Sequence, residues 1–123
     1  MEITYKEESY MIMQSCYEVF KHLGPGLLEI VYKDALEIEF RKQYIPFERE
    51  KKYEIIYKGV KLQRHYLADF VVFGKIILEI KAILKEISDT DISQTLNYLS
   101  LSKNKLGLIV NFSDSVRYKR IVK

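Results

Sequence analysis

Two apolar segments on either side of Gly74 constrain this chain more than any other feature of its sequence. Residues 66–81 are dominated by Val, Ile and Phe, but Asp69, Glu79 and Lys81 are set among them. Branched and aromatic residues of this kind suit a pleated, buried surface. The pattern therefore predicts two antiparallel strands joined by a short loop at residues 73–75, with charged side chains carried into an otherwise apolar hairpin.

The length of this loop determines which residues of the hairpin lie side by side. It pairs Val72 with Ile76, and counting outwards puts Asp69 opposite Glu79. Side chains at directly opposite positions share a face, with Cβ atoms about 5 Å apart. Lys81 follows Glu79 by two residues and falls on the same face, because side chains alternate along a strand. Two carboxylates and an ammonium group are thus predicted to converge.

This convergence has two interpretations. The first is an ion cluster in which Lys81 neutralises Asp69 and Glu79, since partly buried charges are normally paired. The second is a divalent-metal site, because two carboxylates at this separation suit a hard cation such as Mg²⁺. In that case Lys81 would orient or help to deprotonate an attacking water, or offset charge on a phosphate. The hairpin alone favours neither interpretation.

The composition, with 48% hydrophobic and 30% charged residues, is typical of a soluble globular protein. The net charge of +3 is unevenly spread, because residues 58–123 contain 12 Lys and Arg against 6 Asp and Glu. This excess indicates, weakly, an anionic partner, although solvated surface lysines are the commoner explanation. A single cysteine, Cys16, favours a reducing cytoplasm, and neither a membrane span nor a signal peptide is predicted.

Residues 1–123 are predicted to form one domain with an α/β fold, in which a mixed sheet is flanked by helices in the order ααβββαβ. The predicted helices cover residues 7–23, 28–43 and 92–102, and the predicted strands cover residues 53–57, 60–73, 76–80 and 106–110. A helical crossover precedes the last strand, which is therefore expected to lie parallel to a strand of the hairpin. The basic tail at residues 117–123 is predicted to be an edge strand or a short helix.

Three motifs then point to a known family. Asp69, followed on the next strand by Glu79-x-Lys81, resembles the motif of the PD-(D/E)xK nuclease superfamily, whose core is restriction-endonuclease-like. Residues 26–32, GLLEIVY, match the signature of the GxxExxY protein family, a small branch of that superfamily. Residues 94–98, QTLNY, match the QxxxY motif of helicase-associated nucleases on the expected helix. The resemblance covers nearly the whole chain.

The resemblance implies a role for each matching residue. Asp69 and Glu79 would ligate Mg²⁺ or Mn²⁺, with the backbone carbonyl of Ile80 as a third ligand. Glu29 would point from its helix towards the metal. Lys81 would be the catalytic lysine. The proline that gives the superfamily its name is absent.

Two residues of the third predicted helix complete the implied site. Gln94 and Tyr98 are four positions apart, so they share a helix face and would flank the substrate phosphates or brace the site.

Three residues in or near the motifs also have a structural interpretation. Glu29 also suits a helix N-terminus, where a carboxylate is favoured in any protein. Tyr32 is more typical of a core, and His65, although predicted on the face of the site, is more typical of a surface.

The leading functional hypothesis is a divalent-metal-dependent, nuclease-like protein that hydrolyses phosphodiester bonds, with DNA favoured over RNA. The alternative is a catalytically silent module that binds nucleic acid or assembles with proteins and keeps the nuclease fold. A homodimer or a partner protein is compatible with either hypothesis, and a membrane is not expected as a partner.

Overall fold

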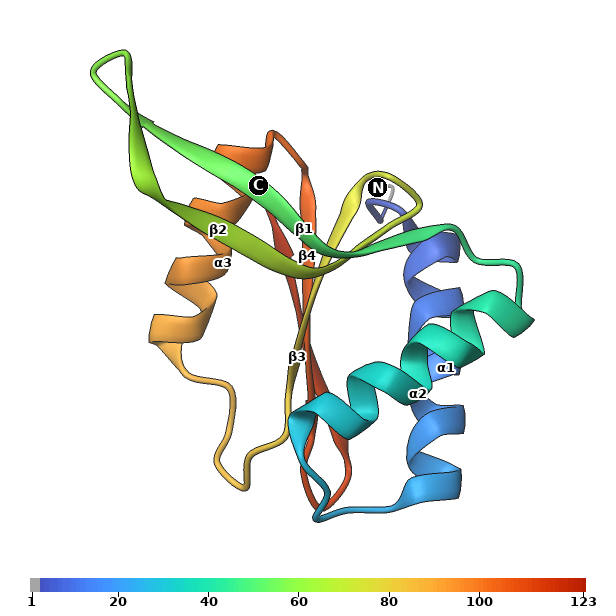
Figure 1. Ribbon diagram of the computed structural model, residues 1–123. Coiled ribbons are helices and arrows are strands. Elements are labelled where there is room, and N and C mark those ends of the chain that lie inside the picture. Colours follow the sequence, from blue (N-terminus) through green and yellow to red (C-terminus); the bar gives the residue numbers. More distant parts are fainter. Residues whose placement is uncertain (1–2) are drawn as a thin grey trace.

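The computed structural model describes residues 3–123, in which a five-stranded mixed sheet is flanked by three helices (Figure 1). The elements run, in order, α1 (Lys6–Leu23), α2 (Glu29–Lys42), β1 (Phe47–Tyr57), β2 (Val60–Val72), β3 (Ile76–Lys81), α3 (Asp89–Ser102), β4 (Leu106–Phe112) and β5 (Val116–Val122). The predicted α/β class and element order are confirmed. The basic tail forms the edge strand β5, one of the two forms expected for it.

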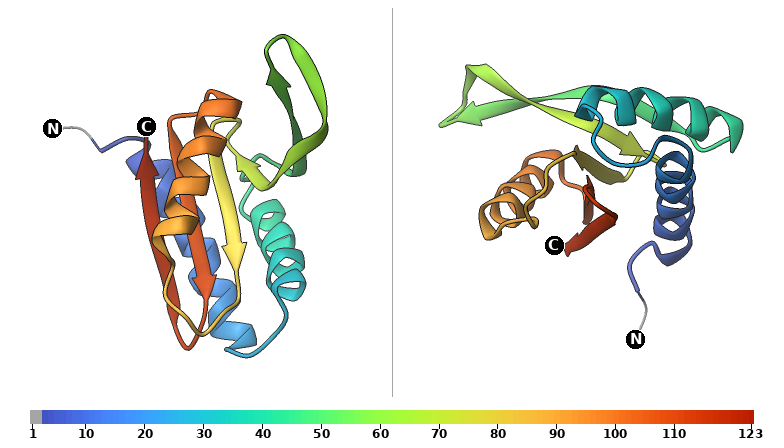
Figure 2. Two further views of the ribbon diagram at one scale, coloured as in Figure 1. Left: turned by 90° about the vertical axis from the view of Figure 1, so that its left-hand side faces the viewer. Right: turned by 90° about the horizontal axis from the view of Figure 1, so that it is seen from below.

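The helices cover the two faces of the sheet unequally. Helices α1 and α2 lie side by side on one face, whereas α3 alone covers the other (Figures 1 and 2). Each face has its own hydrophobic cluster, with Phe70 and Leu78 on the side of α1 and α2, and Val71 and Ile77 on the side of α3. Within residues 3–123, no helix combines the length and the apolar character needed to cross a membrane.

The central hairpin has the predicted register. Val72 pairs with Ile76, and the β2–β3 ladder extends from there to Phe70 and Leu78. Strand β3 then pairs in parallel with β4, as expected from the helical crossover between them. The antiparallel ladder between β2 and β3 stops at Phe70, so the carboxyl-terminal end of β3 has no ladder pairing with β2 at Asp69. On its other edge, this end of β3 remains paired with β4.

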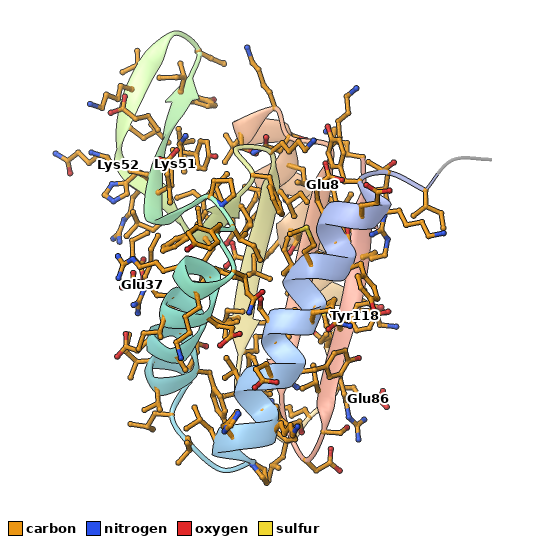
Figure 3. All side chains as sticks on the ribbon, turned by 90° about the vertical axis from the view of Figure 1, so that its right-hand side faces the viewer. Glu8, Glu37, Lys51, Lys52, Glu86 and Tyr118 are labelled. Carbon is orange, nitrogen blue, oxygen red and sulfur yellow. The ribbon has the colours of Figure 1, made fainter. Side chains whose placement is uncertain are left out.

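Strands β1 and β2 continue beyond the rest of the sheet as a two-stranded ribbon, visible at the upper left of Figure 1. We call residues 51–65 of this ribbon the arm. Every residue from 56 to 65 is exposed. The arm contains five basic residues and one acidic residue, in the stretch KKYEIIYKGVKLQRH. Figure 3 shows two of them, Lys51 and Lys52, where the arm leaves the sheet above α2.

Gly107 in β4 allows α3 to lie close to the sheet. A Cβ atom at this position would be 2.6 Å from Cγ2 of Thr95 and 3.6 Å from a methyl group of Leu99. The first of these distances is shorter than two carbon atoms tolerate, and a threonine side chain has little freedom to turn away. The position of α3 over the sheet therefore depends on the absence of a side chain at Gly107.

We expect Gly107→Ala to lower the free energy of unfolding by about 1–3 kcal/mol, because overpacking costs this much in a tight contact. The corresponding fall in Tm would be several degrees in thermal denaturation monitored by circular dichroism. Thr95→Ser removes the Cγ2 methyl group but keeps the hydroxyl that donates to the Asp91 carbonyl. The double variant should recover part of the loss. An equal loss in both backgrounds would show that the Thr95 contact is not the cause.

Candidate active site

A cleft of about 500 Å³ opens between the base of the arm, the end of β3 and the first turns of α3. All the residues predicted from the sequence to form the site line this cleft, namely Glu29, Asp69, Glu79, Ile80, Lys81, Gln94 and Tyr98. The elements that supply them are α2, β2, β3 and α3. The fold thus brings together residues that are far apart in the sequence, and the rest of the site is built around Asp69.

The carboxylate of Asp69 is held by two donors. Oδ1 accepts a hydrogen bond from Nζ of Lys33 at 2.9 Å, and Oδ2 accepts one from the backbone N–H of Ile80 at 2.8 Å. The N–H and C=O groups of one strand residue point to the same side, so the Ile80 carbonyl is also directed towards β2. A carboxylate has about four lone-pair sites, which leaves Asp69 acceptor capacity on both oxygens.

Lys33 is a buried residue that the sequence analysis did not identify. Its side chain is only 8% exposed, and its Nζ lies 3.1 Å from Oε1 of Glu50 as well as 2.9 Å from Asp69. Burial alone would lower the pKa of Lys33, but the hydrogen bonds and charges of Asp69 and Glu50 outweigh it and raise the pKa. The amine is therefore charged at neutral pH and compensates the carboxylates around it.

The strict alternation of β2 breaks at Asp69. Ala68 packs in the cluster on the side of α3, as does Val71, whereas Phe70 packs on the side of α2. On the neighbouring strand, Glu50 adopts a left-handed backbone conformation with φ of 56° between the pairs formed by its neighbours. Irregularities of this kind bend a strand and re-aim its side chains.

This break changes which residue of β2 reaches the site. The expectation that His65 shares the face of Asp69 rests on regular alternation; His65 touches the rim of the cleft but is itself exposed. Tyr66 is instead buried, and its hydroxyl donates a hydrogen bond to Oε1 of Glu79. Burial and the charge of Glu79 raise the pKa of Tyr66, so the phenol remains a donor.

Among the carboxylates of the site, Glu79 has the most strongly shifted pKa. Burial and the nearby charge of Asp69 raise its pKa from an ordinary value of 4.5 to about 8, against the stabilising hydrogen bond from Tyr66. Two carboxylates that are removed from water and face each other cannot both ionise without a compensating cation. Asp69 has such a cation in Lys33, whereas no salt bridge to Glu79 is present among residues 3–123.

Lys81 pairs with a carboxylate that was not predicted to belong to the site. Its Nζ lies 3.3 Å from Oδ1 of Asp91, and no salt bridge joins it to Asp69 or Glu79. Asp91 also accepts a hydrogen bond from the backbone N–H of Ser88 and caps the start of α3. No salt bridge among residues 3–123 therefore supports the interpretation in which Lys81 simply neutralises Asp69 and Glu79. Lys81 pairs with Asp91 on α3, and Asp69 pairs with Lys33 on α2.

Three tyrosine rings form a stack beside the carboxylates. Tyr66 lies between Tyr98, at a centroid distance of 3.7 Å, and Tyr53, at 5.9 Å. The stack joins α3 to the base of the arm, and Tyr98 is half-buried in it. Gln94 lies one turn earlier on α3, exposed to solvent at the edge of the cleft.

The residues of the GxxExxY motif organise the loop before α2. Gly26 has φ of 91°, which favours glycine, and the Tyr32 hydroxyl donates to the Gly24 carbonyl at 2.6 Å. Tyr32 is fully buried and stacks on Phe112, as expected of a core residue. Glu29 is the first residue of α2, with a half-exposed side chain, and burial followed by the charge of Asp69 raises its pKa.

The oxygen donors of the cleft fit a hard divalent cation. Asp69, Glu79 and the carbonyl of Ile80 are the ligand types that Mg²⁺ and Mn²⁺ prefer, and Mg²⁺ is commonly held by one or two carboxylates while it keeps several waters. In the part of the chain that the structure describes, no group of three or more His, Cys, Asp and Glu side chains is placed to hold a metal. The fit is therefore to a two-carboxylate site, with Glu29 lining the same cleft.

A comparison with protein families identifies the superfamily of the chain. Residues 6–122 match the family model described as the PD-(D/E)XK nuclease superfamily, and the chain belongs to that superfamily. Among solved structures, the crystal structure of SSO0001 is similar over 98% of this chain and 80% of its own, with 16% sequence identity and a TM-score of 0.47. That similarity is too low to bear on function. No curated protein matches the chain.

The raised pKa of Glu79 predicts how stability depends on pH in EDTA. The folded state keeps a proton on Glu79 that the unfolded state loses, so this residue costs stability as pH rises from 4.5 to about 8. Glu79→Gln removes this cost. We expect it to raise Tm by several degrees at a pH of about 9 and by much less at about 5.

Glu86→Gln provides the matched control, because Glu86 is exposed and does not line the cleft. Its effect on Tm should be small at both pH values. The interpretation of Glu79 as a destabilising carboxylate is wrong if the two Gln variants change Tm equally across this range.

Proposed function

We propose that this protein is a divalent-metal-dependent nuclease that hydrolyses phosphodiester bonds, with DNA as the favoured substrate. The observation that carries the proposal is the pair of carboxylates, Asp69 and Glu79, beside Lys81 in one open cleft. Burial of two facing carboxylates costs stability, as the raised pKa of Glu79 indicates. Such an arrangement is typical of a functional site and is hard to explain as a structural ion cluster.

Each residue of the cleft has a role in this proposal. Asp69, Glu79 and the Ile80 carbonyl would hold the ion, Mg²⁺ or Mn²⁺, which when bound supplies Lewis-acid activation of water and neutralises charge on the phosphate. Lys81 would donate to the attacking water or to a phosphate oxygen. Asp91 would hold the Lys81 side chain extended along the cleft.

The remaining three residues would act on the substrate and its solvent shell. Gln94 and Tyr98 would contact the substrate phosphates from α3, which lines the cleft next to the base of the arm. Glu29 would accept from water at the same cleft. Its first-turn position on α2 next to Gly26 and Tyr32 also supports assignment to the GxxExxY branch of the superfamily.

The arm supports a polyanionic substrate. Lys52, Lys58 and Arg64 have no salt-bridge partner among residues 3–123, and all three are exposed. Ile55 and His65 of the same arm line the cleft, so a nucleic acid held by the arm would reach the carboxylates. Phosphate contacts of this kind provide affinity without base recognition.

The direct test is a cleavage assay with labelled single- and double-stranded DNA and RNA, in Mg²⁺, Mn²⁺ or EDTA. We expect metal-dependent cleavage of DNA by the wild type. Lys81→Met should reduce the rate about 100-fold or more, because it removes a charged donor at the reacting phosphate. Within residues 3–123, Lys81 has a single ion-pair partner, so the fold should be retained.

Lys85→Met is the control for this variant, because Lys85 is exposed four residues further along the chain. It should cleave at the wild-type rate. Metal-dependent cleavage that survives Lys81→Met would contradict the proposed role of Lys81. Cleavage that survives EDTA would contradict the metal site.

The arm gives a separate prediction on binding, measured by fluorescence anisotropy in the Lys81→Met background. Changing Lys52, Lys58 and Arg64 to Gln should weaken DNA binding and reduce the slope of log K against log salt concentration by about 2–3, at about 0.9 for each phosphate contact. The control is a triple variant of equal charge, Lys6, Lys21 and Lys119 to Gln, on α1 and β5, which lie away from the arm (Figure 2). Equal slopes for both variants would remove the arm from the interface.

A binding module without turnover is the second candidate, and the unpartnered basic residues of the arm favour it. It shares the predicted salt dependence and differs only in the cleavage assay. Salt-dependent binding by a wild type that yields no product in either metal would support this alternative.

A further inference from the structure

The ammonium group of Lys33 lies among three carboxylates at the side of the cleft. Its Nζ is 2.9 Å from Asp69, 3.1 Å from Glu50 and 4.0 Å from Glu29. Lysine is rarely buried unless it is paired, and this side chain is 8% exposed. A compact cation surrounded by carboxylate oxygens has the charge arrangement of a bound metal ion.

Glu50 reaches Lys33 from an unfavourable backbone conformation. Of the non-glycine residues with positive φ in residues 3–123, Glu50 is the one inside a strand, whereas the others lie in turns or at helix ends. Such a conformation persists where the surrounding structure holds it in place, and it is frequent at functional sites. The ion cluster therefore draws on three elements, with Lys33 and Glu29 on α2, Glu50 on β1 and Asp69 on β2.

The two oxygens of Asp69 connect this cluster to the proposed metal site. Oδ1 faces Lys33, while Oδ2 accepts from the N–H of Ile80 beside Glu79. Lys33 thus determines how the Asp69 carboxylate is turned towards the position proposed for the ion. Lys33 contacts Asp69 and does not itself line the cleft, which makes it a positioning residue.

We propose that the ammonium group of Lys33 takes the place of a second cation. It offsets part of the negative charge of Glu29, Glu50 and Asp69, holds one oxygen of the Asp69 carboxylate in place, and limits the cleft to one divalent ion. The inference rests on the proposed function, in which Asp69 and Glu79 hold that ion. Lys33 thus supplies positive charge at the place where a second metal ion would otherwise bind.

The test uses Mn²⁺ alone as the probe, without nucleic acid, and counts bound ions by electron paramagnetic resonance and calorimetry. We expect a single Mn²⁺ site in the wild type. Lys33→Ala removes the ammonium and leaves space among the carboxylates. It should gain a second site and show a Mn²⁺-induced rise in Tm about twice that of the wild type, because each occupied site adds its own stabilisation.

Two further variants separate this effect from a general loss of positive charge. Lys33→Arg retains a cation and should keep a single site. Lys33→Ala combined with Glu50→Gln removes one carboxylate of the cluster and should lose the second site. Two Mn²⁺ sites in the wild type, or a folded Lys33→Ala with an unchanged count, would overturn the proposal. If Lys33→Ala is unfolded in EDTA, refolding of this variant by Mn²⁺ would support the proposal. If the variant does not fold even in Mn²⁺, the number of Mn²⁺ sites in the wild type decides between the outcomes.

The outcomes also distinguish this inference from the proposed nuclease. A wild type with no Mn²⁺ site and no cleavage would reject the nuclease, while a site gained in Lys33→Ala would still support the substitution of a cation by Lys33. A wild type that cleaves DNA with two bound ions would support the nuclease and reject the role of Lys33.

Discussion

The ammonium group of Lys33 and the carboxylate of Asp69 meet at 2.9 Å where α2 crosses the sheet. Both groups are removed from bulk water, and a charge in such a place is tolerated only with a partner and further hydrogen bonds. Glu50 and the Ile80 N–H provide those bonds. The contact therefore fixes α2 against β1 and β2, and with α2 it fixes Glu29 at the edge of the cleft.

The carboxylates of the site do not all have a cationic partner, and this difference has chemical consequences. Asp69 has Lys33, and Asp91 has Lys81, but Glu79 faces Asp69 with no salt-bridge partner among residues 3–123 and accepts a hydrogen bond from the Tyr66 phenol. Glu79, the carboxylate without an ionic partner, thus lies on the central strand β3. It lies next to Asp69, the carboxylate whose orientation is fixed. A cation entering the cleft would relieve this repulsion, which couples ion binding to the stability of the sheet.

The fold was predictable because local and long-range signals agree in the central hairpin. A short loop around Gly74 leaves one register, which the structure has, and the following helix imposes the parallel pairing of β4. The residues proposed for the cleft were identified through motifs of fixed spacing. Each of these motifs lies within one helix, one hairpin, or one helix and the loop directly before it, where the local sequence determines the geometry.

The parts of the site that were missed depend on contacts between distant elements. Lys33 resembles any solvated helix lysine until β1 and β2 are packed over it. Tyr66 was overlooked because regular alternation places His65 on the face of Asp69, and the alternation fails at Asp69 itself. The positive φ of Glu50, opposite this break, has no sequence signal, because glutamate rarely adopts that conformation.

The arm joins the sheet only through its base, where Tyr53 stacks on Tyr66. A two-stranded ribbon is marginally stable by itself, and segments with few buried contacts open at a cost far below that of global unfolding. We therefore expect the arm to open and close as its own cooperative unit, with amide protons that exchange faster than those of β3 and β4. Since Ile55 and His65 line the cleft, this local equilibrium, rather than the stability of the whole sheet, would set how wide the entrance is.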